Sequence, residues 1–229
     1  TRIDPWFWLR DLEDPETLEY LKAENAHTDA VMAPETELIE SLFEEMRGRI
    51  KEDDSTVPEK EGDYFYYTRF EEGSQYPIHC RKYLSLDAPE EVLLNVNELA
   101  KDQDYCRVGR LENSPDHEWL AYSMDTRGSE QYSIFIKNLE TGELLAESIL
   151  NSYYSLEWGN DSRTLFYDVL DENHRPVKIL KHRLGDDPAD DDLIYQEMDE
   201  RFFVHVGKSA SKRFMYVVAA GNNMAEWRF

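Results

Sequence analysis

A strand pattern recurs along this chain at a fixed interval, and this repeat constrains the fold more than any other feature. Its copies cover residues 105–108, 153–156 and 201–204, so that successive copies begin 48 residues apart. Each copy is followed by a polar turn and a second strand, and two copies continue into third and fourth strands. The predicted turns are 114–117, 160–163 and 209–212; the second strands are 119–122, 165–169 and 214–218; the third are 132–137 and 177–182; the fourth are Leu144-Leu145 and 193–195.

An earlier unit shows strands at 64–70, 77–83 and 92–94 but no clear first strand. Four short antiparallel strands in each unit of about 45–50 residues is the pattern of a β-propeller blade. No helical segment separates the strands, which excludes a parallel α/β sheet. The sequence therefore predicts an all-β fold over 53–229, a partial β-propeller of about three and a half blades.

The last residues, 226–229, fall where the third strand of the fourth unit is expected to begin. A propeller removes its exposed edges only when its ring is complete. Open blade edges are sites of strand pairing between molecules. We therefore expect this chain to be a fragment that self-associates through its open end. The start at Thr1 rather than Met likewise suggests trimming or an artificial boundary.

Residues 1–52 have the pattern of helices. Asp14 is positioned to cap a helix that opens with Pro15 and Glu16 and continues toward Asn25. A second helix is predicted after Pro34, with apolar residues at four-residue steps along one side. These residues are Leu38, Leu42, Met46 and Ile50. The pattern indicates a core or docking surface and carries no chemistry.

The chain is strongly acidic, with 49 Asp and Glu against 25 Lys and Arg and a formal net charge of −24. Such a field repels phosphates, which disfavours nucleic acid and anionic membrane surfaces as partners. It attracts cationic ligands such as basic peptides, although acidity also serves solubility alone. The two cysteines, Cys80 and Cys106, lack a second ligand at metal-binding spacing, so no metal is expected. Low cysteine content and the lack of a membrane-length apolar run indicate a cytoplasmic protein.

The sequence offers no convincing catalytic constellation. There is no Gly-x-Ser-x-Gly elbow, and no Gly-rich loop that would bind the phosphates of a cofactor. The six histidines are scattered and are interpreted as structural or solvated: His27, His79, His117, His174, His182 and His205. No catalytic or metal-binding residue is therefore predicted, substrate-binding residues are not identified, and no cofactor is expected.

Three acidic segments remain to be weighed. Residues 185–192 contain five aspartates but lack the spacing of a calcium-binding loop, so a solvated loop is expected. Asp53-Asp54 and Glu71-Glu72 are adjacent pairs, and adjacent side chains of a strand face opposite ways. Neither pair is therefore expected to share a proton.

Several segments, in order and in register from residue 4 to the end, resemble the prolyl oligopeptidase family of serine peptidases, with oligopeptidase B as the most similar branch. They include 4–11, 20–25, 45–50, 54–58, 66–69, 72–73, 75–78, 97–100 and 114–116. One departure is Asn95, where relatives usually have Asp. The resemblance implies a seven-bladed propeller inserted into an α/β-hydrolase domain. Residues 1–52 would then be an N-terminal extension packing on that domain, and 53–229 the first blades.

The same resemblance implies that the parent protein hydrolyses short peptides after Arg or Lys through an acyl-enzyme. Its catalytic Ser, Asp and His would lie beyond Phe229, so that this chain alone is expected to be inactive. The propeller would limit access to flexible oligopeptides, and its acidity would attract basic ones. Two alternatives stay open: a propeller that binds partners without catalysis, and a prolyl oligopeptidase that cleaves after Pro.

Overall fold

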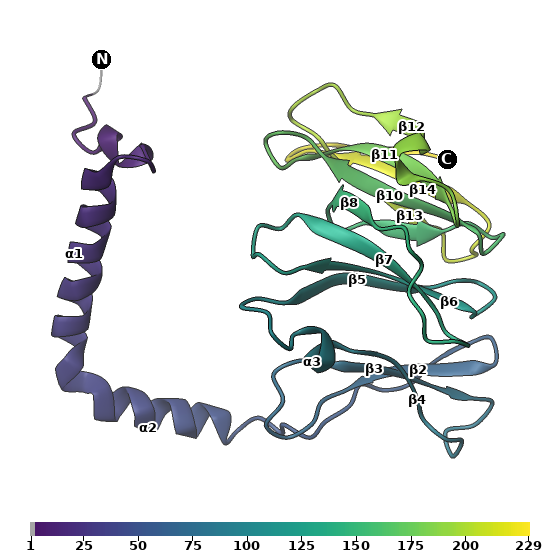
Figure 1. Ribbon diagram of the computed structural model, residues 1–229, viewed down its shortest axis with the longest axis horizontal. Helices are drawn as coiled ribbons and strands as arrows, with labels where there is room; N and C mark the ends of the chain where they lie inside the picture. The colour runs from purple at the N-terminus through teal and green to yellow at the C-terminus, as the bar shows by residue number, and fades with distance from the viewer. Residues whose placement is uncertain (1–2) are drawn as a thin grey trace. The chain divides into compact units, whose positions relative to one another are not determined.

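The computed structural model describes residues 3–229, and the chain divides into two compact units between Glu52 and Asp53 (Figure 1). The first unit is helical. It contains η1 (Phe7–Arg10), α1 (Pro15–Met32), η2 (Ala33–Glu35) and α2 (Thr36–Arg47). The second unit contains all of the β-strands.

The predicted start of the first helix is confirmed. Asp14 has an extended backbone, and its side chain accepts a hydrogen bond from the backbone N–H of Glu16 at 2.9 Å. Pro15 occupies the first helical position, where its missing N–H costs no hydrogen bond. The helix runs past Asn25 to Met32, because no helix-breaking residue intervenes before Pro34.

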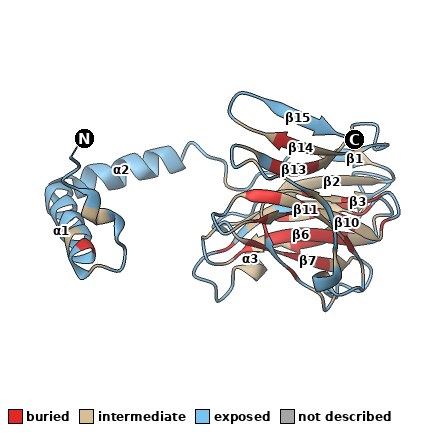
Figure 2. Cartoon of the chain, turned by 90° about the horizontal axis from the view of Figure 1, so that it is seen from above, coloured by how far each residue is buried: buried red, intermediate tan, exposed pale blue. Residues whose placement is uncertain are grey.

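The apolar side of α2 is exposed: Leu38 is 53% and Met46 59% accessible to solvent. Figure 2 shows the helix in the colour of exposed residues along nearly its whole length. Ile50, predicted as part of the same helical side, lies beyond the end of α2 at Arg47. The helix ends there because Gly48, a weak helix former, follows directly.

The second unit consists of four antiparallel sheets that follow one another in chain order. Three have four strands and the last has three, which confirms the prediction of a partial β-propeller. The blades are β1 (Glu59–Glu61), β2 (Tyr64–Arg69), β3 (Ile78–Tyr83) and β4 (Glu91–Asn95); β5 (Arg107–Asn113), β6 (Trp119–Asp125), β7 (Tyr132–Asn138) and β8 (Ile149–Ser152); β9 (Leu156–Trp158), β10 (Thr164–Leu170), β11 (Pro176–Arg183) and β12 (Asp192–Gln196); and β13 (Phe203–Lys208), β14 (Met215–Ala220) and β15 (Ala225–Arg228). Two short helices, α3 (Val96–Leu99) and η3 (Pro188–Asp190), complete the structure.

The structure corrects two details of the predicted blades. The first blade does have an inner strand, β1, whose three charged residues pair with β2; Lys60 of this strand also lies over the ring of Phe65. The fourth strand of the second blade is β8 and not Leu144-Leu145. Leu144 forms only an isolated bridge with Lys137, and the chain then leaves the sheet and returns at Ile149.

The hydrophobic core is divided among the spaces between successive blades. The largest cluster joins the second and third blades and includes Ile134, Ile149 and Trp158, each about 1% exposed or less. A second cluster around Leu93 and Tyr122 joins the first and second blades, and a third around Ile179 and Val206 joins the last two. Each blade therefore buries its apolar side chains against an adjacent blade.

The turns between the first and second strands of all four blades share one backbone feature. Gly62, His117, Ser162 and Lys212 each have a left-handed conformation, with φ between 56° and 62°. These residues contact the next turn along the series. A Cβ atom on Gly62 would lie 2.7 Å from the His117 ring, Ser162 Oγ accepts from Asp116 N at 3.0 Å, and Lys212 O accepts from Asn160 Nδ2 at 3.0 Å. Lys212 also forms an ion pair with Glu61 of the first blade.

Candidate functional site

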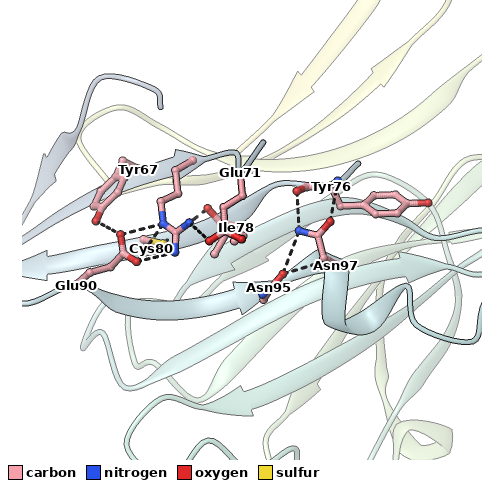
Figure 3. Close-up of polar contacts among 9 residues, drawn as sticks. Tyr67, Glu71, Tyr76, Ile78, Cys80, Glu90, Asn95 and Asn97 are labelled. Carbon is pink, nitrogen blue, oxygen red and sulfur yellow. Dashed lines mark hydrogen bonds and ion pairs between the residues drawn. The ribbon is translucent and has the colours of Figure 1, made fainter. Parts of the chain in front are cut away.

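Segments that carry the family resemblance come together at one edge of the first blade (Figure 3). Asn97, at the start of α3, accepts from Tyr76 N at 3.0 Å and donates to Tyr76 O at 2.8 Å. Asn95 caps α3 by accepting from Asn97 N at 3.0 Å. The side-chain amide of Asn97 thus satisfies the backbone N–H and C=O of Tyr76, in the loop before β3. These motif residues fasten the blade and do not form a reactive centre.

A second group, which includes Tyr67, Glu71 and Glu90 of Figure 3, surrounds the guanidinium of Arg69 at the end of β2. Arg69 bonds to both oxygens of Glu90 at 3.0–3.1 Å and to Glu71 at 2.6 Å. Tyr67 donates to the same Glu90 carboxylate at 2.6 Å. The hydrogen bonds from Arg69 hold the pKa of Glu90 below its usual value. Arg69 is thus paired with two carboxylates, and both Arg69 and Glu90 lie close enough to the buried Cys80 to affect the pKa of its thiol.

Both cysteines are unpaired and buried. Burial raises the pKa of the Cys80 thiol to about 11, and burial likewise raises the pKa of Cys106. A thiol is nucleophilic as the thiolate. These cysteines are therefore inert packing residues.

The six histidines lie on different structural elements. His27 lies on the exposed side of α1, and His174 is in the turn after β10 beside Gln131. His79 contacts Thr68 Oγ1 at 3.1 Å, and His117 contacts the Tyr66 hydroxyl at 2.7 Å. Burial lowers the pKa of both rings, and Arg81 lowers that of His117 further. His182 is fully buried and belongs to a separate polar cluster.

One serine, one aspartate and one histidine do meet between the third and fourth blades. Ser155 Oγ donates to Asp168 at 2.8 Å, and His205 Nδ1 lies 3.8 Å from the same carboxylate. In a catalytic triad the histidine lies between the other two and accepts the proton of the serine. Here the hydroxyl is bonded directly to the carboxylate and also accepts from Val206 N at 3.2 Å. The histidine does not lie between the serine and the aspartate, so this arrangement does not activate the hydroxyl as a nucleophile.

Asp168 has a structural task that the sequence analysis did not identify. Its carboxylate, 0% exposed, accepts from Tyr153 N, Ser155 N and the hydroxyls of Ser152 and Ser155. It thereby fixes the connection between the second and third blades. The available signal was a single acidic residue inside the apolar strand 164–170.

The acidic run 185–192 forms the connection between β11 and β12 and lines a cavity of about 690 Å³ beside the fourth blade. Among residues 3–229, no group of three His, Cys, Asp or Glu side chains is arranged to hold a metal ion. Asp53-Asp54 and Glu71-Glu72 lie outside the strands, so the predicted strand alternation does not apply to them. Within the same described residues, no helix has both the length and the apolar character needed to cross a membrane.

Charged side chains on the inner strands of the second to fourth blades neutralise one another. Arg110 lies 2.5 Å from Glu112, and Lys208 lies 3.5 Å from Glu157. Burial raises the pKa of Glu112; Arg110 opposes this rise and the nearby Glu157 adds to it. These inner-strand carboxylates are paired with resident cations, whereas Asp186, Asp187 and Asp190 of the loop after β11 border a cavity.

The raised pKa of Glu112 predicts a pH-dependent loss of stability. The folded state holds the Glu112 proton more tightly than the unfolded state does. The resulting stabilisation is complete at acidic pH and is lost as pH rises from the ordinary glutamate value through the raised one. Glu112→Gln is therefore expected to raise the melting temperature at pH 7 and to leave it nearly unchanged at pH 4. Calorimetry at both pH values measures this difference.

The control Glu157→Gln, which removes the partner of the buried Lys208, should lower the melting temperature at pH 7. An equal response of both variants would contradict the interpretation.

Comparison with known proteins defines the class to which this fold belongs. Residues 1–229 match the family described as the prolyl oligopeptidase N-terminal β-propeller domain. The chain belongs to this family, which confirms the resemblance seen in the sequence.

Particular relatives agree with the oligopeptidase B branch. The chain is 38% identical to a protein named protease 2 from Moraxella lacunata, over 98% of this chain and 34% of the relative. It is 41% identical to dipeptidyl aminopeptidase BI from Pseudoxanthomonas mexicana, over 99% of this chain and 34% of that protein. The structure of oligopeptidase B from Leishmania major superposes with a TM-score of 0.92 at 30% identity, covering 99% of this chain and 32% of the other. The chain therefore spans about a third of the length of these relatives.

Proposed function

We propose that this chain is the N-terminal helical extension and first blades of a serine oligopeptidase that cleaves short peptides after Arg or Lys. The observation that carries the proposal is the family match over the whole chain together with the 0.92 TM-score to an oligopeptidase B. The catalytic residues of such an enzyme would lie in a following α/β-hydrolase domain, and this chain alone would be inactive. The free thiols Cys80 and Cys106 support a reducing, cytoplasmic location.

The exposed apolar side of α2 supports an extension that packs on that hydrolase domain. Leu38, Leu42 and Met46 are about half exposed or more. An apolar helical side of this kind is stable when another surface covers it. The complete enzyme offers such a surface in its own catalytic domain, which makes that domain the proposed partner.

The acidity of the chain supports a preference for basic peptides. Because the inner-strand carboxylates Glu112 and Glu157 are neutralised by resident cations, attraction would come from outer acidic side chains such as Asp186, Asp187 and Asp190. Attraction of this kind accelerates encounter and weakens with salt. We expect kcat/KM of the complete enzyme for a dibasic peptide to fall as ionic strength rises. A neutral peptide of equal length is the control. Equal salt dependence for the two peptides would exclude steering.

Cleavage assays on the complete protein test the proposed activity. Fluorogenic peptides ending in Arg-Arg and in Gly-Pro are compared, with and without a phosphonylating inhibitor of serine enzymes. Inhibitor-sensitive cleavage after Arg is the expected result. Preference for Pro would replace the proposed specificity, and release of N-terminal dipeptides would favour the activity named for the Pseudoxanthomonas relative. Absence of all cleavage would favour a propeller that only binds partners.

We further propose that this chain associates with itself through the exposed strand β15. All four residues of β15 are exposed, and Trp227 and Phe229 are 54% and 83% accessible. Unpaired strand edges with apolar side chains form intermolecular sheets. Light scattering during size-exclusion chromatography is expected to show a mass that rises with concentration in the micromolar range. The double substitution Trp227→Lys with Phe229→Lys should reduce this rise. A constant monomeric mass for the unmodified chain would contradict the proposal.

A further inference from the structure

A buried polar cluster in the third blade is separate from every feature used above. His182, on β11, is 0% exposed, and its Nδ1 lies 2.8 Å from Asp191 Oδ1. The Asp191 side chain is 2% exposed and also accepts from the hydroxyl of Tyr167, on β10, at 2.8 Å. Burial and the Asp191 carboxylate raise the pKa of Tyr167, so this hydroxyl remains a donor throughout the neutral range.

The other nitrogen of the imidazole faces a second carboxylate. His182 Nε2 lies 4.0 Å from Glu147 Oε1, whose side chain is 11% exposed. Among the described residues no group lies within hydrogen-bond distance of this buried nitrogen. The same Glu147 oxygen accepts from Gly185 N at 3.0 Å. Glu147 belongs to the connection between β7 and β8, so it links the second blade to the loop that follows β11.

The cluster therefore contacts both ends of the acidic loop 185–191, and the His182 imidazole lies between the two contacts. Gly185 is held by Glu147, and Asp191 is held by His182 and Tyr167. Tyr167, Asp191 and Glu147 are the titratable groups that face His182, each from a different strand or loop. We propose that His182 is a proton-controlled latch for the loop 185–191.

The latch has two states that differ by one proton. When the ring carries both protons, Nδ1–H donates to Asp191 and Nε2–H points at the Glu147 carboxylate, so that Glu147 stays beside Gly185. When the ring is neutral with its proton on Nδ1, a bare Nε2 lone pair faces a carboxylate oxygen, which is repulsive in a buried setting. Glu147 then loses its attraction to the ring, so the Gly185 end of the loop is held by the Glu147 hydrogen bond alone and opens more readily.

Release of the loop would alter the cavity that it lines. Asp186, Asp187 and Asp190 on this loop border the cavity of about 690 Å³ together with Lys181 and Arg183. Protonation of one buried ring would thus control the shape of this cavity.

Hydrogen exchange of the loop amides tests the latch. After correction for the intrinsic pH dependence of exchange, amides of residues 185–191 are expected to be about tenfold better protected at about pH 6 than at about pH 8, as for gain of a charge-assisted hydrogen bond. His182→Gln should abolish the difference, because an amide does not take up a proton. The control His174→Gln, in the turn that precedes β11, should retain it.

A second variant keeps the test decisive if His182→Gln does not fold. Glu147→Gln preserves an oxygen that accepts from Gly185 N but removes the negative charge facing Nε2. It should therefore fold and show equal protection at both pH values. Equal protection at both pH values in the unmodified chain would overturn the latch. An undiminished pH difference in either latch variant would overturn it as well.

Discussion

Asp168→Ala is expected to lower the free energy of unfolding of the propeller unit by about 3 kcal/mol or more, the range for removing a buried, charged hydrogen-bond acceptor. The variant strands four donors at once: the amides of Tyr153 and Ser155 and the hydroxyls of Ser152 and Ser155. Asp168→Asn should be intermediate, since one oxygen remains to accept.

Urea unfolding followed by circular dichroism measures this effect. The matched control is Asp199→Ala, which removes an exposed carboxylate that pairs with Arg201. Arg201 lowers the pKa of Asp199 to about 2, yet exposed pairs of this kind contribute little to stability because solvent screens them. Similar losses for Asp168→Ala and Asp199→Ala would show that the buried carboxylate does not organise the blade connection.

Trp158→Ala is expected to destabilise the same unit by about 3–5 kcal/mol, as for other fully buried aromatic side chains. Trp158 is 1% exposed in the core between the second and third blades, and its indole Nε1 donates to Glu112 O at 3.0 Å. The substitution leaves both a cavity and an unpaired carbonyl. Because Trp158 lies on β9 and packs between the second and third blades, its loss would also weaken the contact between these two blades.

Thermal unfolding with tryptophan fluorescence and circular dichroism distinguishes this effect from a local change. Trp6→Ala, in the helical unit at a site 57% exposed, is the control and should change the stability by less than about 1 kcal/mol. A small effect at Trp158 would indicate that the blades are held mainly by polar contacts between their turns.

The repeat length predicted most of the fold, because strand alternation is a local signal that survives in each blade. The failures have physical causes. Residues 59–61 are all charged, so β1 shows no apolar alternation, although its backbone pairs with β2. Leu144-Leu145 looked like an outer strand, but Glu147 turns toward Gly185 and the sheet resumes at Ile149. A contact with another blade decided that boundary, and no local pattern encodes it.

The candidate sites were less predictable than the fold. Reading His182 as structural is consistent with its burial, but its two carboxylate partners are separated from it in sequence by 9 and 35 residues. The Asn97–Tyr76 pair was visible as two matching motifs, although their mutual hydrogen bonds were not. Sequence shows that a polar residue interrupts an apolar strand; only the fold shows which groups satisfy it.

The left-handed turns distinguish the four blades from one another. Each turn has the same backbone shape, yet each meets its neighbour through different chemistry: an imidazole over Gly62, the hydroxyl of Ser162, and the carbonyl and ammonium groups of Lys212. Exchanging two blades would preserve every strand and still leave each turn beside the wrong partner. The contacts between the turns therefore specify the order of the blades. Blades with the same strand arrangement are not interchangeable.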